Sequence, residues 1–133
     1  MGRALFRHPG VRLAAVALIV PGYDEAIAFF VGGLGWRLTA DEDQGAKRWV
    51  TVAAGVIEIV LARADGPAQR AAIGAQWAGR VGLFLRTDDL ARDAARIVAA
   101  GGAFEEAPRR EAYGTVAVWR DPWGNRWDLI GPA

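Results

Sequence analysis

Residues 12–36 have the sequence RLAAVALIVPGYDEAIAFFVGGLGW, and this stretch decides the fold. It opens with a short apolar run that stops at Pro21 and Gly22, which is typical of a buried strand. Apolar residues then recur at helical spacing after Asp24, and glycines end this helix before a new strand at residues 36–40. The stretch therefore predicts a strand, a helix and a second strand in close succession.

The same order of elements continues outward and then recurs. The further predicted elements are strands at residues 48–53, 56–62, 80–87, 115–120 and 126–130, a weak strand that begins at Phe104, and a helix at 90–100. No strand is predicted in the charged stretch from Glu105 to Tyr113. The chain thus repeats a strand–helix–three-strand unit, at about residues 12–63 and about 80–131, with a connector at about 64–79 that holds at most one helical turn.

This repeat predicts an α+β fold in a single domain of residues 1–133. A chain of 133 residues suits one domain of ordinary size. Hydrophobic residues make up 53% of it and charged residues 23%, which is the balance of a folded globular protein. Because each half alone buries little apolar surface, we expect the halves to pack together and a second copy to join them as a homodimer.

The composition excludes several kinds of chemistry. The chain has no cysteine and no serine, so disulfides, thiolate nucleophiles, zinc–cysteine sites and Ser–His–Asp catalysis are excluded. His8 is the only histidine, and one chain therefore cannot build a two-histidine metal site. We expect His8 itself to be an exposed residue near the N-terminus.

Charge and hydropathy limit the classes of binding partner and the cellular locations that the sequence allows. The net charge is +1, from 16 basic and 15 acidic residues without a basic cluster, which argues against nucleic-acid binding. The longest uncharged runs have 11 residues, against the ~20 that a membrane-spanning helix needs. The first residues lack the apolar core of a signal peptide. We therefore expect a cytoplasmic protein that binds neither nucleic acid nor a membrane.

Three stretches resemble the vicinal oxygen chelate superfamily, which groups glyoxalase I, bleomycin-resistance proteins, fosfomycin-modifying enzymes and extradiol dioxygenases. They are residues 16–30 with 33–36, residues 83–90, and residues 113–114 with 120–130 (RDPWGNRWDLI). The resemblance implies two βαβββ repeats that form curved mixed sheets around a cleft. In the metal-dependent members four ligands line that cleft, typically histidines and glutamates.

Carried over position by position, the resemblance places those four ligands at Ala15, Glu58, Gly82 and Asp128. Both histidine positions hold residues without a donor atom, and both carboxylate positions keep a carboxylate. We therefore predict a member of this family that lacks the histidine ligands and holds no metal or other cofactor. Two carboxylates alone suit only Mg²⁺ or Mn²⁺ bound largely through water.

Strand alternation then assigns side chains to the cleft, if the two carboxylates point into it as the family implies. The residues predicted in this way to bind a ligand are Trp49, Glu58, Phe84, Arg86, Arg126 and Asp128; the register that the resemblance implies adds Val118 and Arg120, and the loop before them adds Tyr113. An apolar cavity with a few convergent polar groups is the usual form of a small-molecule site. Of the other tryptophans, Trp36, Trp119 and Trp127 are expected in the core, and Trp77 in the connector is a candidate lid.

The three arginines of this set allow two interpretations. In the first, they replace the charge of the metal, pair with Glu58 and Asp128, and bind an anionic or carbonyl ligand on which Trp49 stacks. In the second, they belong to a structural ion-pair network that fills the space left by the metal.

Three functions are compatible with these residues. The one we favour is a metal-free binding protein of the bleomycin-resistance type, which holds a small anionic, carbonyl or aromatic molecule in an apolar cleft rimmed by arginines and carboxylates. The alternative is a lyase or isomerase that uses Glu58 or Asp128 as the general base on a carbonyl substrate, with or without Mg²⁺ or Mn²⁺. The third is a structural or regulatory dimer whose cleft is vestigial.

Overall fold

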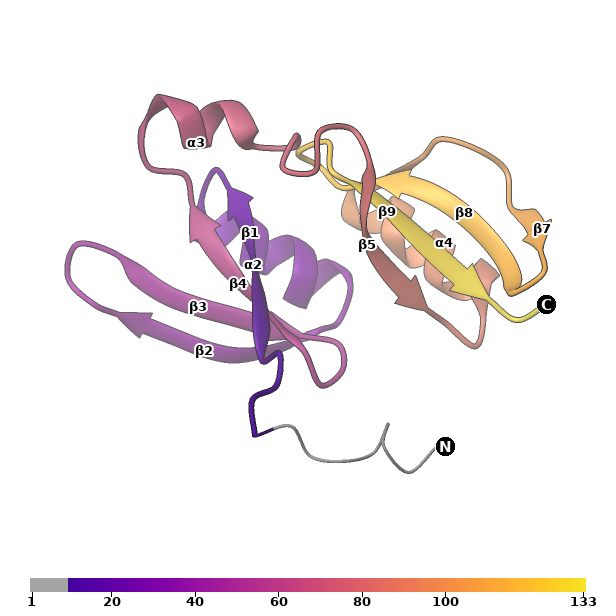
Figure 1. Cartoon of the computed structure of the whole chain (residues 1–133), viewed down its shortest axis with the longest axis horizontal. Coiled ribbons are helices and arrows are strands. Elements are labelled where there is room, and N and C mark those ends of the chain that lie inside the picture. Colours follow the sequence, from indigo (N-terminus) through magenta and orange to yellow (C-terminus); the bar gives the residue numbers. More distant parts are fainter. Residues whose placement is uncertain (1–9) are drawn as a thin grey trace.

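The chain forms two mixed β-sheets that lie side by side, each with helical segments packed on one face (Figure 1). A computed structural model describes residues 10–133, so His8 lies outside the described part. The elements in chain order are β1 (Ala15–Val20), α2 (Tyr23–Ile27), η1 (Ala28–Gly33), β2 (Arg37–Asp43), β3 (Arg48–Ala53), β4 (Glu58–Arg63), α3 (Gly66–Ala72), β5 (Val81–Arg86), α4 (Leu90–Ala100), β6 (Ala103–Phe104), β7 (Arg109–Glu111), β8 (Gly114–Arg120) and β9 (Arg126–Gly131). No helix in this part of the chain is long and apolar enough to cross a membrane.

Both sheets are built in the same order. The first has the strand order β1-β4-β3-β2, and the second has the order β5-β9-β8-β6, with β7 also paired to β8. In each sheet the first and last strands of the unit are parallel neighbours. Ala15 thus pairs with Glu58 in the first sheet, and Phe84 pairs with Asp128 in the second. The predicted α+β fold of two βαβββ repeats is confirmed.

The first helix and the connector differ in detail from the prediction. The helix begins at Tyr23 and continues from Ala28 as a π-helix, which is wider than an α-helix. The strand predicted at residues 36–40 runs on to Asp43. The connector contains the helix α3, whose first turn holds Pro67 at a position where the missing N–H of proline is tolerated.

The prediction that no strand lies between Glu105 and Tyr113 is wrong. β7 lies in this stretch and pairs with β8. Its side chains are charged, and Arg109 Nε donates a hydrogen bond to Glu111 Oε2 at 2.8 Å. Because charged edge strands show no hydrophobic period, pattern analysis does not detect this strand.

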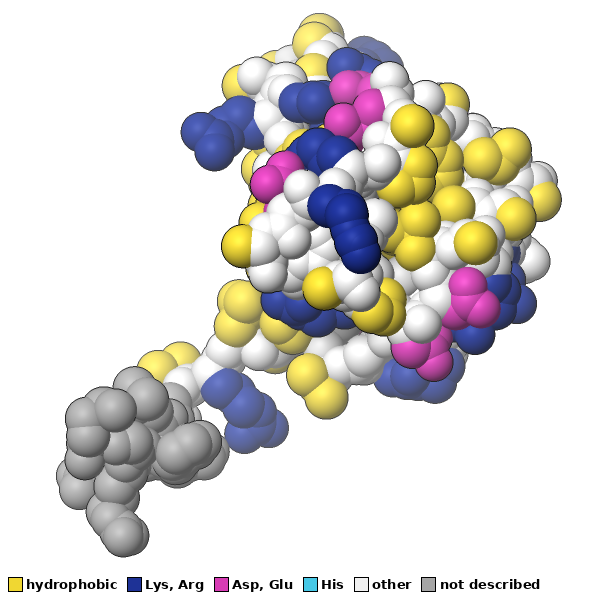
Figure 2. Space-filling view, turned by 90° about the vertical axis from the view of Figure 1, so that its right-hand side faces the viewer, with side chains coloured by type: hydrophobic (Ala, Val, Ile, Leu, Met, Phe, Trp, Pro, Cys, Tyr) yellow, Lys and Arg dark blue, Asp and Glu magenta, His cyan; other side chains and the backbone are white. Residues whose placement is uncertain are grey.

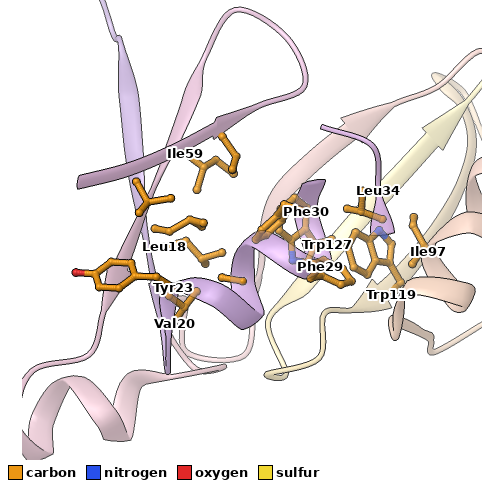
Figure 3. Close-up of a cluster of buried hydrophobic side chains, with 14 of the residues drawn as sticks. Leu18, Val20, Tyr23, Phe29, Phe30, Leu34, Ile59, Ile97, Trp119 and Trp127 are labelled. Carbon is orange, nitrogen blue, oxygen red and sulfur yellow. The ribbon is translucent and has the colours of Figure 1, made fainter. Parts of the chain in front are cut away.

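One cluster of buried side chains joins the two halves (Figure 3). Phe29 and Phe30 of η1 lie against Trp119 and Trp127 of the second sheet, with ring centroids 6.2 Å apart for Phe29–Trp119 and 6.0 Å for Phe30–Trp127. The two indole rings are themselves stacked at 5.0 Å, and Trp36 packs partly buried beside them, as the sequence predicts. The helix of the first repeat therefore completes the core beneath the second sheet.

The two helical segments approach closely where η1 passes α4. A Cβ atom on Gly33 would lie 2.5 Å from the Cβ atom of Ala100, which is closer than such atoms come in proteins. Any side chain at this position would push the two helices apart. Gly32, one residue earlier, has no neighbouring atom within 4 Å of the corresponding point.

One buried carboxylate holds the predicted turn between β8 and β9. Asp121 Oδ1 accepts hydrogen bonds from the backbone N–H groups of Trp123, Gly124 and Asn125 at 3.1, 3.0 and 2.9 Å. Asp121 Oδ2 accepts hydrogen bonds from Asn125 Nδ2 at 2.9 Å and from Trp127 Nε1 at 3.0 Å. Asp121 thereby ties the turn to the stacked tryptophans of the core.

Candidate ligand-binding site

The polar centre of the second sheet is Asp128, on β9. Its side chain is almost fully buried, with 8% of the residue exposed. Its neighbours on the adjoining strands are Phe84 and Val118, which are apolar. None of the described residues donates a hydrogen bond to the buried Oδ1 atom of Asp128. Such a buried acceptor without a partner is uncommon, because it loses its hydrogen bonds to water without gaining others.

Burial also changes the acidity of this carboxyl. It raises the pKa of Asp128, while the positive charges of Arg109 and Arg126 oppose part of the rise and the negative charge of Glu106 adds to it. A carboxyl group that keeps its proton to higher pH can donate a hydrogen bond as well as accept one. The carboxyl of Asp128 thus keeps its proton to higher pH than that of an exposed aspartate.

Six of the nine predicted ligand-binding residues share one face of the second sheet, because paired residues lie on the same side of neighbouring strands. We call this the Asp128 face; its predicted members are Phe84, Arg86, Val118, Arg120, Arg126 and Asp128. Viewed from the side of the second sheet, the molecule shows hydrophobic side chains gathered among basic and acidic ones (Figure 2).

Two arginines of the Asp128 face pair with a glutamate that sequence reasoning missed. Arg126 donates to both carboxylate oxygens of Glu105, from Nε at 2.9 Å and from Nη2 at 3.0 Å. Arg120 Nε lies 2.8 Å from Glu105 Oε2. The expected pairs with Glu58 and Asp128 are therefore replaced, because Glu105 directly follows β6 at the end of the sheet where Arg120 and Arg126 face each other. The hydrogen bonds from Arg126 lower the pKa of Glu105.

Two further charged residues near Asp128 were also missed. Glu106 Oε2 accepts a hydrogen bond from the backbone N–H of Val118 at 3.0 Å and another from the guanidinium group of Arg109. Arg109 and Glu106 thus form a fixed pair that borders the Asp128 face on the side of β7. The only signal in the sequence was the group of charged residues at 105–111 (EEAPRRE), which carried no information about the partner strand.

The other three predicted residues lie outside the Asp128 face. Trp49 and Glu58 belong to the first sheet, where the strand register puts them on one face. Glu58 helps to line a small cavity of about 470 Å³ that Arg12 and Thr39 also line. Tyr113 is exposed in the turn between β7 and β8.

The four positions where the family places metal ligands do not supply a metal site. Ala15 and Glu58 pair on the first sheet, whereas Gly82 lies at a bulge in β5 on the second. A Cβ atom on Gly82 would lie 2.1 Å from Cδ2 of Trp77, so the indole ring occupies the space that a ligand side chain would need. Among residues 10–133, no three histidine, cysteine, aspartate or glutamate side chains gather as metal ligands. The donors at these positions therefore do not fit a metal ion.

The connector that carries Trp77 is held against both sheets. Gln76 accepts a hydrogen bond from the backbone N–H of Ile19 at 2.8 Å and donates one to the carbonyl oxygen of Ala17 at 2.7 Å. The side-chain amide thus pairs with the free edge of β1 as a neighbouring strand would. On the other side, Arg126 Nη1 donates a hydrogen bond to the carbonyl oxygen of Gly79 at 3.0 Å.

Comparisons with known proteins agree with this architecture. The family model of the Glyoxalase/Bleomycin resistance protein/Dioxygenase superfamily matches residues 12–129. A protein of Shewanella frigidimarina (strain NCIMB 400), described as uncharacterized, is 46% identical over 120 residues, which are 86% of this chain and 89% of that protein.

Solved structures give the same result. The crystal structure of UcmS2 superposes with a TM-score of 0.77 at 29% identity and covers 90% of this chain and 97% of that chain. The crystal structure of TnmS3, an antibiotic binding protein from Streptomyces sp. CB03234, gives a TM-score of 0.73 at 28% identity and covers 96% of this chain and 100% of that chain. On these matches and on its fold, the chain belongs to the Glyoxalase/Bleomycin resistance protein/Dioxygenase superfamily.

Proposed function

We propose that this protein binds a small organic molecule on the Asp128 face without the help of a metal ion. The observation that carries the proposal is the buried Oδ1 atom of Asp128, to which no described residue donates a hydrogen bond. A ligand that supplies a polar atom here satisfies a group the protein leaves unsatisfied. The site is thus prepared for a partner that the chain itself does not provide.

The surroundings of Asp128 favour an aromatic molecule that carries a carbonyl or hydroxyl group. Phe84 pairs with Asp128 across the sheet and is 63% exposed, which leaves its ring free to stack on a ligand. The raised pKa of Asp128 favours a protonated carboxyl that donates to a carbonyl oxygen. Antibiotic binding by TnmS3, whose structure is similar to this one, supports a ligand of this kind.

A ligand screen tests this proposal. Purified protein is tested by thermal shift against aromatic antibiotics, carbonyl metabolites and simple anions, and each hit is measured by calorimetry. We expect Phe84→Ala and Asp128→Ala each to weaken binding of a hit by about tenfold or more, as loss of a central aromatic or hydrogen-bonded contact does. Glu58→Gln, on the other sheet, is the control. A hit that binds both Asp128-face variants as tightly as the wild type contradicts the proposed site, and metal analysis of the same samples tests the absence of a metal.

A second candidate function is supported by the acidity of Asp128. A raised pKa moves a carboxyl towards the range in which it can act as a general acid or base, so an enzyme that abstracts a proton beside a carbonyl group fits the same face. If the protein is such an enzyme, Asp128→Asn abolishes turnover while the substrate still binds. Glu58→Gln tests the other candidate base, and added Mg²⁺ or Mn²⁺ tests the need for a cation.

We further propose that the protein is a homodimer in which a second copy covers the Asp128 face. The two sheets of one chain lie side by side, and Phe84, the neighbour of Asp128 on the second sheet, remains 63% exposed. An exposed aromatic residue beside a polar centre is typical of a face that another surface covers. Light scattering is expected to give twice the mass of the chain, and the mass of a monomer would contradict this arrangement.

A further inference from the structure

A second cavity lies between the two halves of the molecule, on the opposite side of the second sheet from Asp128. Its volume is about 960 Å³, which is within the range of small-molecule sites. Trp127 and Leu129, the chain neighbours of Asp128 on β9, line it. Because successive residues of a strand point to opposite faces, the sheet separates the interior of this cavity from Asp128, whereas Phe84 and Arg86 of the Asp128 face also reach the cavity at the edge strand β5. We call it the wedge cavity, since it opens between the free edges of β1 and β5.

The inside of the wedge cavity is apolar and is built by both halves. Its inner lining includes Leu34, Trp36, Ile59, Leu85, Trp127 and Leu129. Ile59 comes from the first sheet and Leu85 from the second, so a molecule in the cavity would touch both. An apolar lining of this size binds a hydrocarbon chain or ring system in preference to water.

The mouth of the cavity is positively charged. Arg86, at the end of β5, and Arg96, on α4, line it; neither is in ion-pair distance of a described carboxylate, although the charge of Arg96 helps to lower the pKa of Asp93, which also lines the cavity. Arg92, which also lines the cavity, already pairs with Asp88 at 2.7 Å and with Asp93 at 3.1 Å. Two arginines at the mouth thus remain available for an anionic group.

Apolar side chains at the rim extend the cavity surface outward. Leu13 is 68% exposed and Val56 is 97% exposed, and both line the cavity at its open side. Exposed apolar groups around a pocket usually mark a surface that a ligand or partner covers. The wedge cavity therefore combines an apolar interior, an apolar rim and two unpaired cations.

We propose that the wedge cavity binds an amphipathic carboxylate, with its apolar body between the sheets and its charged group at Arg86 and Arg96. The charge complementarity at the mouth selects an anion over a neutral or cationic amphiphile. A carboxylate can accept hydrogen bonds from a guanidinium group in a bidentate manner, which a neutral alcohol cannot match. The two sites share Phe84 and Arg86 at the edge strand β5, so Arg96→Glu and Asp128→Asn, each of which changes one site alone, separate their tests.

The test uses dodecanoate below its micelle concentration as the probe and dodecanol as the neutral control of equal chain length. Binding is followed by tryptophan fluorescence, because Trp36 and Trp127 line the cavity, and by calorimetry. We expect dodecanoate to bind and to raise the melting temperature, with dodecanol at least about tenfold weaker, which corresponds to ~1.4 kcal/mol.

Four variants test where dodecanoate binds. Arg86→Glu and Arg96→Glu are each expected to weaken dodecanoate binding by about tenfold, because they replace an attracting charge by a repelling one. Arg110→Glu, the same change of charge on the exposed strand β7, is expected to leave it unchanged. Asp128→Asn is also expected to leave it unchanged, because Asp128 faces away from the cavity. Circular dichroism of every variant shows whether the fold is intact.

Several results would overturn the proposal. One is the absence of dodecanoate binding to the folded wild type, and another is equal binding of dodecanol. Binding that survives both arginine reversals, or that is lost with Asp128→Asn, places the probe elsewhere. If Arg96→Glu, which lies outside the Asp128 face, changes the mass of the protein in solution, a second copy covers the cavity instead, and the proposal is wrong.

Discussion

Single carboxylates of this chain have opposite roles that their surroundings decide. Asp121 accepts hydrogen bonds through both oxygens and organises a turn, whereas Asp128 is buried with an oxygen that no described residue contacts by a hydrogen bond. Glu105 differs from both, because two arginines hold it at the end of the sheet. The first and third of these groups stabilise the fold, and the second is the group that we propose contacts a ligand.

Loss of the Asp121 carboxylate is expected to destabilise the protein strongly. Asp121→Ala removes the acceptor of backbone and side-chain hydrogen bonds in a buried turn, and the donors cannot all reach water. We expect the free energy of unfolding to fall by about 3 kcal/mol or more. Urea denaturation measures this. The control is Asp43→Ala. The Asp43 carboxylate accepts one exposed hydrogen bond, from the backbone N–H of Gly45, and its removal is expected to change the free energy of unfolding by less than about 1 kcal/mol.

The pH dependence of stability is expected to differ in sign between Asp128 and Glu105. The folded-state pKa of Asp128 is raised, so its contribution to stability is present at low pH and is lost as the pH rises through that pKa. Asp128→Asn should therefore gain stability relative to the wild type between about pH 4 and pH 7. The pKa of Glu105 is lowered, so its contribution is present above the unfolded pKa and is lost as the pH falls.

The paired measurement is urea denaturation of both variants across this pH range. Glu105→Gln should be destabilised relative to the wild type at neutral pH, and this difference should shrink as the solution becomes acidic. If the free energy of unfolding depends on pH in the same way for the wild type, Asp128→Asn and Glu105→Gln, the pKa directions given for both carboxyl groups are wrong.

At the scale of elements, the connector between the repeats acts as a third partner of the two sheets. Gln76 pairs with the open edge of β1, and Trp77 lies over Gly82 on β5. Gly74 sits so close to the turn before β9 that a Cβ atom would lie 1.8 Å from the carbonyl oxygen of Trp123. Each contact needs a particular residue type, although the segment has no hydrophobic period.

The contacts of Gln76 are expected to protect the edge of β1. Gln76→Ala removes two hydrogen bonds to the strand, which should lower the free energy of unfolding by about 1–3 kcal/mol. Hydrogen exchange should also speed up at the amide of Ile19, which donates to Gln76. The matched control is Gln69→Ala, since Gln69 accepts one exposed hydrogen bond from the backbone N–H of Asp65 at 2.8 Å. Unchanged exchange at Ile19 would show that the hydrogen bonds of Gln76 do not protect this edge of β1.

At the scale of the whole molecule, the two halves are joined more by helices and connector than by their sheets. Phe29 and Phe30 of η1 lie against the tryptophans of the second sheet, and Gly33 permits η1 to approach α4. The wedge cavity lies where the sheet edges do not meet. The arrangement of the halves therefore depends on a few close contacts.

A side chain at Gly33 is expected to loosen this arrangement. In Gly33→Ala the new methyl group would overlap Ala100, and we expect a loss of about 1–3 kcal/mol in the free energy of unfolding. Gly32→Ala adds the same methyl group into open space and should be neutral or stabilising by up to about 1 kcal/mol. Thermal denaturation of the two variants compares them directly, and equal melting temperatures would contradict the close contact.

How much could be predicted from the sequence differs between these scales. The strands and helices of both repeats were predicted, because apolar periodicity marks β1, β4, β5 and α4. The charged strand β7 was missed because it has no such period. Within the site, alternation along residues 80–87 put Phe84 on the cleft face, since alternation is a local property, and the register implied by the family resemblance put Val118 there. The pairing of Arg126 with Glu105 was missed, because it joins segments far apart in the chain.

The packing of Trp77 on Gly82 has a consequence for the paths by which this sequence can change. A histidine at position 82 requires the space that the indole ring fills, so it can be accepted only after Trp77 has become smaller. If the histidine at position 82 appears first, the intermediate variant has a displaced strand β5. Two neighbouring substitutions are thus coupled in order, because the ring of Trp77 fills the space beside position 82.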